Sequence, residues 1–275
     1  MTFHVVEAFT ASKTKHDDDN EDTYADGPIW TVVCDGTSDK SGYRLNGRTG
    51  GWHVSRLIAE VFTAAGPGAT TTDLLTAINL RYDDLFGSTV EPSSPERPSA
   101  VFTAFNKVDG TVVRVGDVTW TDGTDVFAVQ NKVEAVHVAM RSNYLRMLLA
   151  EGATVEELLE HDPARALILP SLRREVAFRN RADVGDLAFA AVDGRHIPDQ
   201  FIEKWTVGPN VTAVAIASDG YPRVLSTLDE TETYLQDDLL RDPLRIGRHA
   251  GTKAPSLGFV SFDDRTYVRL TRDAS

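Results

Sequence analysis

The sequence predicts an α+β fold in which largely antiparallel strands form the sheets and the helices form layers of their own. Most neighbouring strand-like runs are joined by turns too short for the crossover that parallel strands require. The helical segments are grouped between blocks of strands, which argues against a doubly wound sheet. Composition does not change along the 275 residues, so we expect one domain over residues 1–275.

The first strands are predicted from apolar runs that end in turn residues. Residues 3–10 are predicted as a strand, and the Asp-rich stretch 12–27 as a loop, because neighbouring like charges discourage regular structure. Residues 29–34 are a nearly continuous apolar run rich in β-branched and aromatic side chains. Asp35 and Gly36 stop this run, which indicates a buried strand that ends in a turn.

Two helices are expected after a loop at residues 37–51. From Trp52 to the break at Gly66, apolar side chains are spaced as on one face of an amphipathic helix. Residues 72–86 show a similar apolar side. Together the two segments predict a helical layer.

The second half of the chain is predicted to return to strands. Asp-Gly dipeptides separate three strand-like runs and predict an antiparallel meander at residues 100–107, 111–118 and 124–130. Residues 140–150 look helical, and Thr154 with Glu157 has the spacing of a capping box. Hydrophobic periodicity predicts the remaining elements: strands at about 175–180, 186–192, 211–217 and 265–270, and a helix at about 227–240.

The charge balance excludes several classes of partner. With 41 acidic against 28 basic residues the formal net charge is −13, which repels the phosphates of nucleic acids and anionic lipids. We therefore expect no nucleic-acid partner and no membrane partner. The single cysteine, Cys34, cannot form an internal disulfide, and no export signal or membrane-spanning apolar run is visible. The expected location is the cytoplasm.

Carboxylates at strand ends are the best candidates for chemistry. Asp35, Asp193 and Asp219 each end an apolar strand-like run and are followed by glycine. An unpaired charge at the edge of a core is costly, and a cation is one way to compensate it. Taken singly, each is better explained as a capped turn. The histidines show none of the usual zinc spacings, and no Gly-x-Ser-x-Gly elbow is present.

Five short motifs follow one another over nearly the whole chain: residues 20–22 (Asn-Glu-Asp), 32–36 (Val-Val-Cys-Asp-Gly), 115–117 (Val-Gly-Asp), 217–220 (Ala-Ser-Asp-Gly) and 263–266 (Asp-Asp-Arg-Thr). In this order they resemble the motifs of metal-dependent serine/threonine phosphatases of the protein phosphatase 2C (PPM) family. The resemblance implies a sandwich of two antiparallel sheets flanked by helices, with a metal site at one edge. It also implies hydrolysis of phosphoserine or phosphothreonine in a phosphorylated protein substrate, with a cognate serine/threonine kinase as a further candidate partner.

The resemblance assigns the main metal ligands residue by residue. Asp35 matches the carboxylate that bridges two metal ions, and Gly36 matches a residue whose backbone carbonyl binds one of them. Asp219 and Asp263 match the other carboxylates of the second ion, so Asp35, Asp219 and Asp263 form the implied catalytic set. The implied ions are Mn²⁺ or Mg²⁺, which prefer oxygen ligands and lower the pKa of a bound water that can attack phosphorus.

Further acidic residues match outer positions of the same site. Asp117 matches the acid associated with a third, weaker ion, and Glu21 and Asp22 match an acidic pair that reaches the metal-bound waters. For Asp117 a plainer interpretation is open, because it is also well placed to end a hairpin strand.

The sequence departs from the family pattern at the substrate pocket. Asp17 occupies the position of the arginine that binds the substrate phosphate, and Lys13 or Lys15 could replace it. The residues after Gly36 also lack the usual glycine-rich continuation. An alternative function is therefore open: a phosphatase-like binding or regulatory module with weak or no turnover.

Overall fold

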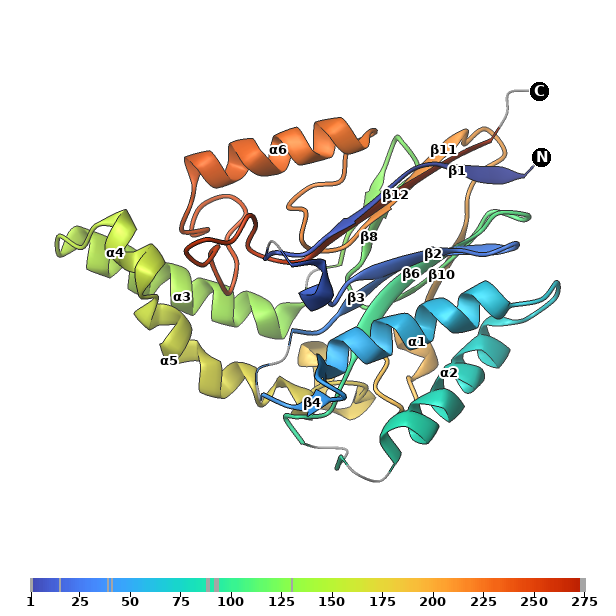
Figure 1. Ribbon diagram of the computed structural model, residues 1–275, viewed down its shortest axis with the longest axis horizontal. Helices are drawn as coiled ribbons and strands as arrows, with labels where there is room; N and C mark the ends of the chain where they lie inside the picture. The colour runs from blue at the N-terminus through green and yellow to red at the C-terminus, as the bar shows by residue number, and fades with distance from the viewer. Residues whose placement is uncertain are drawn as a thin grey trace.

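Two five-stranded sheets pack face to face, and helices cover both outer faces (Figure 1). This arrangement is seen in a computed structural model, which describes residues 2–272 except residues 15, 39, 41, 88–89, 92–93 and 130. All strand ladders between the described residues are antiparallel. The predicted α+β class and the sandwich of antiparallel sheets are therefore confirmed.

Each sheet combines strands from distant parts of the chain. The first, called the β1 sheet, has the order β1 (Phe3–Ala11), β12 (Arg265–Arg272), β11 (Ala213–Ala217), β8 (Thr119–Thr121) and β9 (Val126–Phe127). The second, called the β3 sheet, has the order β10 (Glu203–Thr206), β7 (Thr111–Val115), β6 (Ala100–Asn106), β3 (Trp30–Gly36) and β2 (Thr23–Asp26). A small hairpin pairs β4 (Arg44–Leu45) with β5 (Arg48–Thr49).

Side chains of β3 alternate between two hydrophobic layers. Val33 lies between the sheets and packs in the same core as Phe105 and Val268. Val32 and Cys34 belong to the core on the other face of the β3 sheet. Because both faces are covered, β3 shows a continuous apolar run instead of the alternation of a half-exposed strand.

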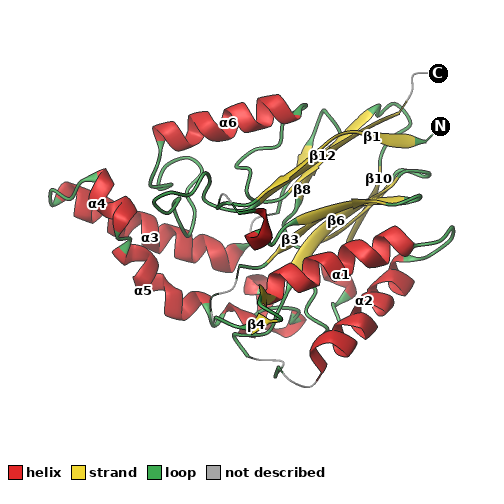
Figure 2. Cartoon of the chain, viewed as in Figure 1, coloured by secondary structure: helices red, strands yellow, loops and turns green. Residues whose placement is uncertain are grey.

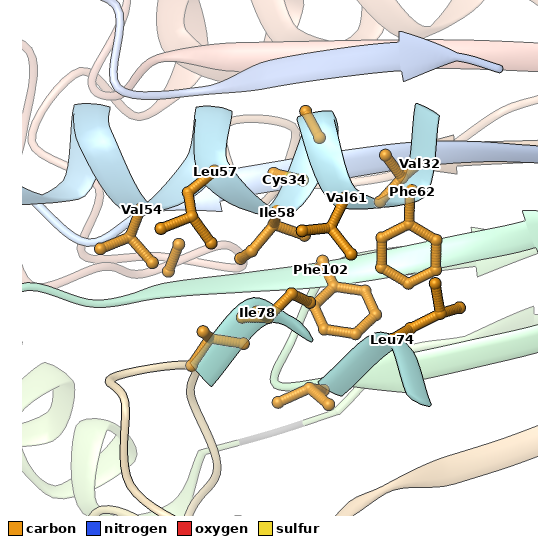
Figure 3. Packing of buried hydrophobic residues seen from close by; sticks show 14 of the residues in the cluster. Val32, Cys34, Val54, Leu57, Ile58, Val61, Phe62, Leu74, Ile78 and Phe102 are labelled. Atoms are coloured by element: carbon orange, nitrogen blue, oxygen red, sulfur yellow. The ribbon is translucent and has the colours of Figure 1, made fainter. Parts of the chain in front are cut away.

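Two helices cover the outer face of the β3 sheet. Figure 3 shows α1 (Gly50–Ala64) directing Ile58 and Phe62 toward Phe102 of β6, with α2 (Thr71–Phe86) beside it. Both helices follow the apolar spacing read from the sequence, although α1 begins two residues before Trp52. The predicted helical layer is confirmed.

The remaining helices lie over the other sheet and beyond one end of the sandwich (Figure 2). Helix α6 (Leu228–Arg241) packs Leu235 against the outer face of the β1 sheet. Helices α3 (Lys132–Ala150), α4 (Val155–Glu160) and α5 (Pro163–Leu172) extend from the end opposite the chain termini. Among the described residues, no helix is both long enough and apolar enough to cross a bilayer.

Several local predictions are wrong. The predicted loop 12–27 contains β2, whose short polar sequence carries no apolar run and which forms through its pairing with β3. Residues 175–180 and 186–192 are not strands but contain 3₁₀ turns and isolated bridges. A short apolar run does not extend far enough to show the periodicity that distinguishes a strand from a helical turn.

The predicted meander is divided between the two sheets. Strands β6 and β7 pair in the β3 sheet, whereas β8 and β9 pair in the β1 sheet. The chain crosses at Gly116, whose φ is +90°, and a Cβ atom there would lie 2.2 Å from Cγ1 of Val101. This tight crossing places the next residue, Asp117, at the end that the two sheets share.

Candidate metal centre

The predicted carboxylates come from strand ends at one edge of the sandwich. Asp22 precedes β2 and Asp35 lies near the end of β3, in the β3 sheet. Asp219 follows β11 and Asp263 precedes β12, in the β1 sheet. Asp117 lies between β7 and β8, where the chain passes from one sheet to the other. Antiparallel pairing brings these ends together, and the charge of Asp35 interacts with those of the other four.

Asp22 and Asp35 form the inner part of the cluster. Asp22 is 2% exposed, and its Oδ2 atom is buried without a hydrogen-bond partner in the described part of the chain. Burial, followed by the negative charge of Asp264, raises the pKa of Asp22. Burial also raises the pKa of Asp35, together with the charges of Asp22 and Asp219. This crowding makes positive charge at the cluster favourable.

Asp219 lies against Asp35 on the side that opens to a cavity. Restricted solvation and the charge of Asp263 raise the pKa of Asp219, while its contact with Asp35 and the charge of Lys253 oppose this rise. Two buried carboxylates this close favour a cation near them.

A further acid, Glu134, lies beside Asp117. It belongs to the first turn of α3, and its charge interacts with Asp117 and Asp219. Burial and neighbouring negative charge raise the pKa of Asp117 and of Glu134 to about 7. Sequence analysis missed Glu134, because an acid in the first turn of a helix is common and carries no motif.

Asp263 has a different environment, because two lysines contact it. Lys253 Nζ lies 2.6 Å from Oδ2, and Lys13 Nζ lies 3.3 Å from Oδ1. Although burial opposes ionisation, Lys253 and Lys13 lower the pKa of Asp263. Lys253 was not a sequence candidate, since nothing near it in the chain marks it as different from a surface lysine.

Asp264 anchors the segment that carries Lys13. It accepts hydrogen bonds from the backbone N–H of Lys13 at 2.8 Å and of Glu21 at 2.9 Å. Its Oδ2 atom also lies 3.1 Å from Lys13 Nζ. Asp264 is 2% exposed, so it is a buried anchor beneath the site.

Gly36 and Glu21 meet where β3 ends. A Cβ atom on residue 36 would lie 2.5 Å from the carbonyl oxygen of Glu21, so glycine permits this close approach. The same carbonyl accepts a hydrogen bond from the Ser55 hydroxyl at 2.6 Å. The Glu21 carboxylate pairs with Lys13, with Oε2 at 3.4 Å from Nζ. Lys15, the other lysine considered for phosphate binding, lies outside the described residues.

Two cavities open at the cluster and share Ser38, Arg165 and Lys253 in their walls. The first, of about 310 Å³, is lined by four of the five strand-end carboxylates. The second, of about 470 Å³, is lined by Lys13 and Glu21. Carboxylates and cationic side chains therefore both border open space at this edge.

The oxygen donors of the cluster are of the type that a hard divalent cation prefers, but their side chains are not arranged closely enough to hold one. Within the described ranges, no three His, Cys, Asp or Glu side chains are grouped closely enough to hold an ion as they stand. The Oδ2 atom of Asp22, which has no hydrogen-bond partner among the described residues, and the mutual charges of Asp35 and Asp219 mark where positive charge is favoured. Oxygen donors of this kind suit Mg²⁺ or Mn²⁺ after small side-chain movements.

Solved structures of bacterial phosphatases have a similar fold. The chain is similar to the serine/threonine phosphatase Stp1 from Staphylococcus aureus, with 14% identity, coverage of 98% of this chain and 94% of that one, and a TM-score of 0.51. It is also similar to a bacterial serine phosphatase, with 14% identity, 99% coverage of both chains and a TM-score of 0.50. No family model and no curated protein matches the chain. At this identity the similarity establishes the fold.

Proposed function

We propose that this protein is a divalent-metal-dependent phosphatase that hydrolyses phosphoserine or phosphothreonine in proteins. The observation that carries the proposal is the convergence of Asp22, Asp35 and Asp219 from two sheets, with a buried carboxylate oxygen that has no partner in the described part of the chain. The phosphatase fold and the order of the sequence motifs support it. The matched carboxylates gather at one edge, which supports turnover over the alternative of an inactive module.

The proposed metal ligands are the carboxylates of Asp22, Asp35 and Asp219 and the carbonyl of Gly36, with Glu21 at the metal-bound waters. A bound Mg²⁺ or Mn²⁺ supplies a water of lowered pKa and a positive charge next to the phosphate. Asp117, with Glu134 beside it, is proposed for a weaker ion. Asp263 belongs to the implied set as well, but both of its oxygens already face lysines.

The substrate phosphate is proposed to bind at the lysines. Lys13 was a candidate from the sequence, and the structure adds Lys253, which lines both cavities. Ammonium groups make charge-assisted hydrogen bonds to phosphate oxygens without needing the fixed geometry of an arginine. This arrangement can compensate for the arginine that the sequence lacks at Asp17.

The test is hydrolysis of a phosphoserine peptide with added Mn²⁺, with and without chelator. We expect turnover that chelation abolishes and Mn²⁺ restores, and a loss of several orders of magnitude in Asp35→Asn, which keeps shape but removes a ligand charge. The matched control is Asp122→Asn in the β8–β9 turn, where the side-chain oxygen only accepts backbone N–H bonds. Full turnover in chelator, or in Asp35→Asn, would contradict the proposal.

A further inference from the structure

Both carboxylate oxygens of Asp263 are held by ammonium groups. Oδ2 lies 2.6 Å from Lys253 Nζ, and Oδ1 lies 3.3 Å from Lys13 Nζ. Oδ1 also accepts a hydrogen bond from the backbone N–H of Asp264 at 3.0 Å. Asp263 is therefore already compensated by side chains of this protein.

The other carboxylates of the cluster lack such partners. Among the described residues, Asp22, Asp35 and Asp219 form no ion pair with a lysine or arginine, and Oδ2 of Asp22 has no hydrogen-bond partner at all. Charge compensation at the site is thus uneven. Asp22, Asp35 and Asp219 need a cation, whereas Asp263 already contacts two ammonium groups.

The lysines are built into the site from two separate segments. Lys13 follows β1 and is held by buried Asp264, which contacts both its backbone N–H and its ammonium group. Lys253 comes from the loop before β12, and its ammonium group also lies 3.4 Å from the Ser38 hydroxyl. Lys13 is 17% and Lys253 24% exposed in the side chain, so neither is a freely moving surface lysine.

A metal ion at Asp263 would have to displace these ammonium groups or lie against them. Ammonium and metal ions repel each other strongly in a site with little water. Displacing Lys13 would also leave the buried carboxylate of Asp264 without its charged partner, which is unfavourable. Retaining the lysines avoids both penalties.

We infer that the site binds one divalent cation, through Asp22, Asp35 and Asp219, and that Lys13 and Lys253 provide at Asp263 the positive charge that a second ion would provide in a two-metal site. This inference rests on the proposed function and changes the way the phosphate is held. The metal contacts the phosphate from one side, and the two lysines, which reach the cavity walls, contact it from the other.

Titration of the metal-free protein with Mn²⁺ tests the count directly. Isothermal titration calorimetry should give one Mn²⁺ per chain, and the paramagnetic resonance spectrum should be that of an isolated ion. The titration is repeated in Asp117→Asn, so that a weaker ion near Glu134 is not counted. Two ions per chain in this background, with the spectrum of a spin-coupled pair, would overturn the inference.

Substitution of both lysines should raise the number of bound Mn²⁺ ions from one to two. Lys13→Met with Lys253→Met frees Asp263, and this double variant should bind two Mn²⁺ ions and show spin coupling. The control is Lys107→Met, which breaks an ion pair of 2.6 Å with Asp26 away from the site and should still bind one. If the double variant does not fold, Lys253→Met alone serves, since Lys13 and its anchor remain. A single ion in a folded lysine variant would contradict the inference.

The outcomes separate this inference from the proposed function. Two ions per chain in the Asp117→Asn background, with phosphopeptide hydrolysis by the wild type, leave the phosphatase intact and remove only the role of the lysines. Wild-type protein that binds no Mn²⁺ and shows no turnover removes both. One bound ion with chelator-sensitive turnover supports both.

Discussion

At the scale of single residues, neighbouring acids with the same chemistry have different tasks. Asp263 lines the cavity and contacts two lysines. Asp264 is buried, and its hydrogen bond with the backbone N–H of Lys13 links the segment after β1 to the start of β12. The difference arises because successive residues at a strand end point to opposite sides. Asp193 illustrates the same point: it ends an apolar run as Asp219 does, but it is fully buried and paired with Arg195 at 2.6 Å.

Asp264→Ala should destabilise the fold more than loss of an exposed ion pair. The change leaves the backbone N–H groups of Lys13 and Glu21 without their acceptor and removes a buried partner of an ammonium group, so we expect a loss of about 3 kcal/mol. Asp18→Ala, which removes an exposed pair with Arg48, should cost less than about 1 kcal/mol. Urea unfolding of the metal-free proteins measures both. Equal losses would show that Asp264 does not anchor this segment.

At the scale of elements, the tight connection between β7 and β8 gives the site its shape. Its two strands belong to different sheets, and Asp117 directly follows Gly116 at the crossing. The sequence predicted β7 within the run 111–118 but not β8, and it placed the runs in one meander, because a turn dipeptide indicates where the chain turns and not which sheet it enters. Helix α5 was missed altogether. Its proline at the first position is a start signal, but Pro170 within it disfavours helix on propensity alone.

Alanine substitutions of Gly116, at this connection, and of Gly123, in the β8–β9 turn, separate the cost of backbone strain from the cost of a steric clash. Gly116 and Gly123 have nearly equal φ values of +90° and +88°, but only at Gly116 would a Cβ atom meet a neighbour, Val101. Gly123→Ala should cost about 1 kcal/mol from strain alone. Gly116→Ala should cost about 3 kcal/mol, because a side chain in contact with the crossing must also move. Thermal unfolding compares the two variants, and similar values would mean that the crossing adapts freely.

At the scale of the whole molecule, the sequence indicates the strand-end carboxylates more directly than the lysine contacts of Asp263. Asp35 and Asp219 could be found because each follows an apolar run, and antiparallel pairing brings such ends to one edge. The contacts of Lys13 and Lys253 with Asp263 could not be predicted from the sequence, because they depend on how two distant loops fold over that edge. The single domain remains a prediction, and the roles of the acids remain proposals.

Because the site joins the ends of both sheets, metal binding should stabilise the whole fold. Binding to the native state alone adds about 2.7 kcal/mol to the free energy of unfolding at a Mn²⁺ concentration about 100-fold above Kd. Asp35→Asn should lose most of this gain. The metal-free variant should be at least as stable as metal-free wild type, because the change removes one negative charge from a crowded cluster.

Melting temperatures of both proteins, with Mn²⁺ and with chelator, check this expectation. Asp122→Asn should respond to Mn²⁺ as the wild type does. A wild-type Tm that stays constant at Mn²⁺ concentrations where calorimetry shows binding would mean that the unfolded chain binds the ion as well as the folded one, so that binding does not depend on the edge where the sheets meet. An Asp35→Asn variant with the full Mn²⁺ response would make Asp35 a turn residue and move the proposed site elsewhere.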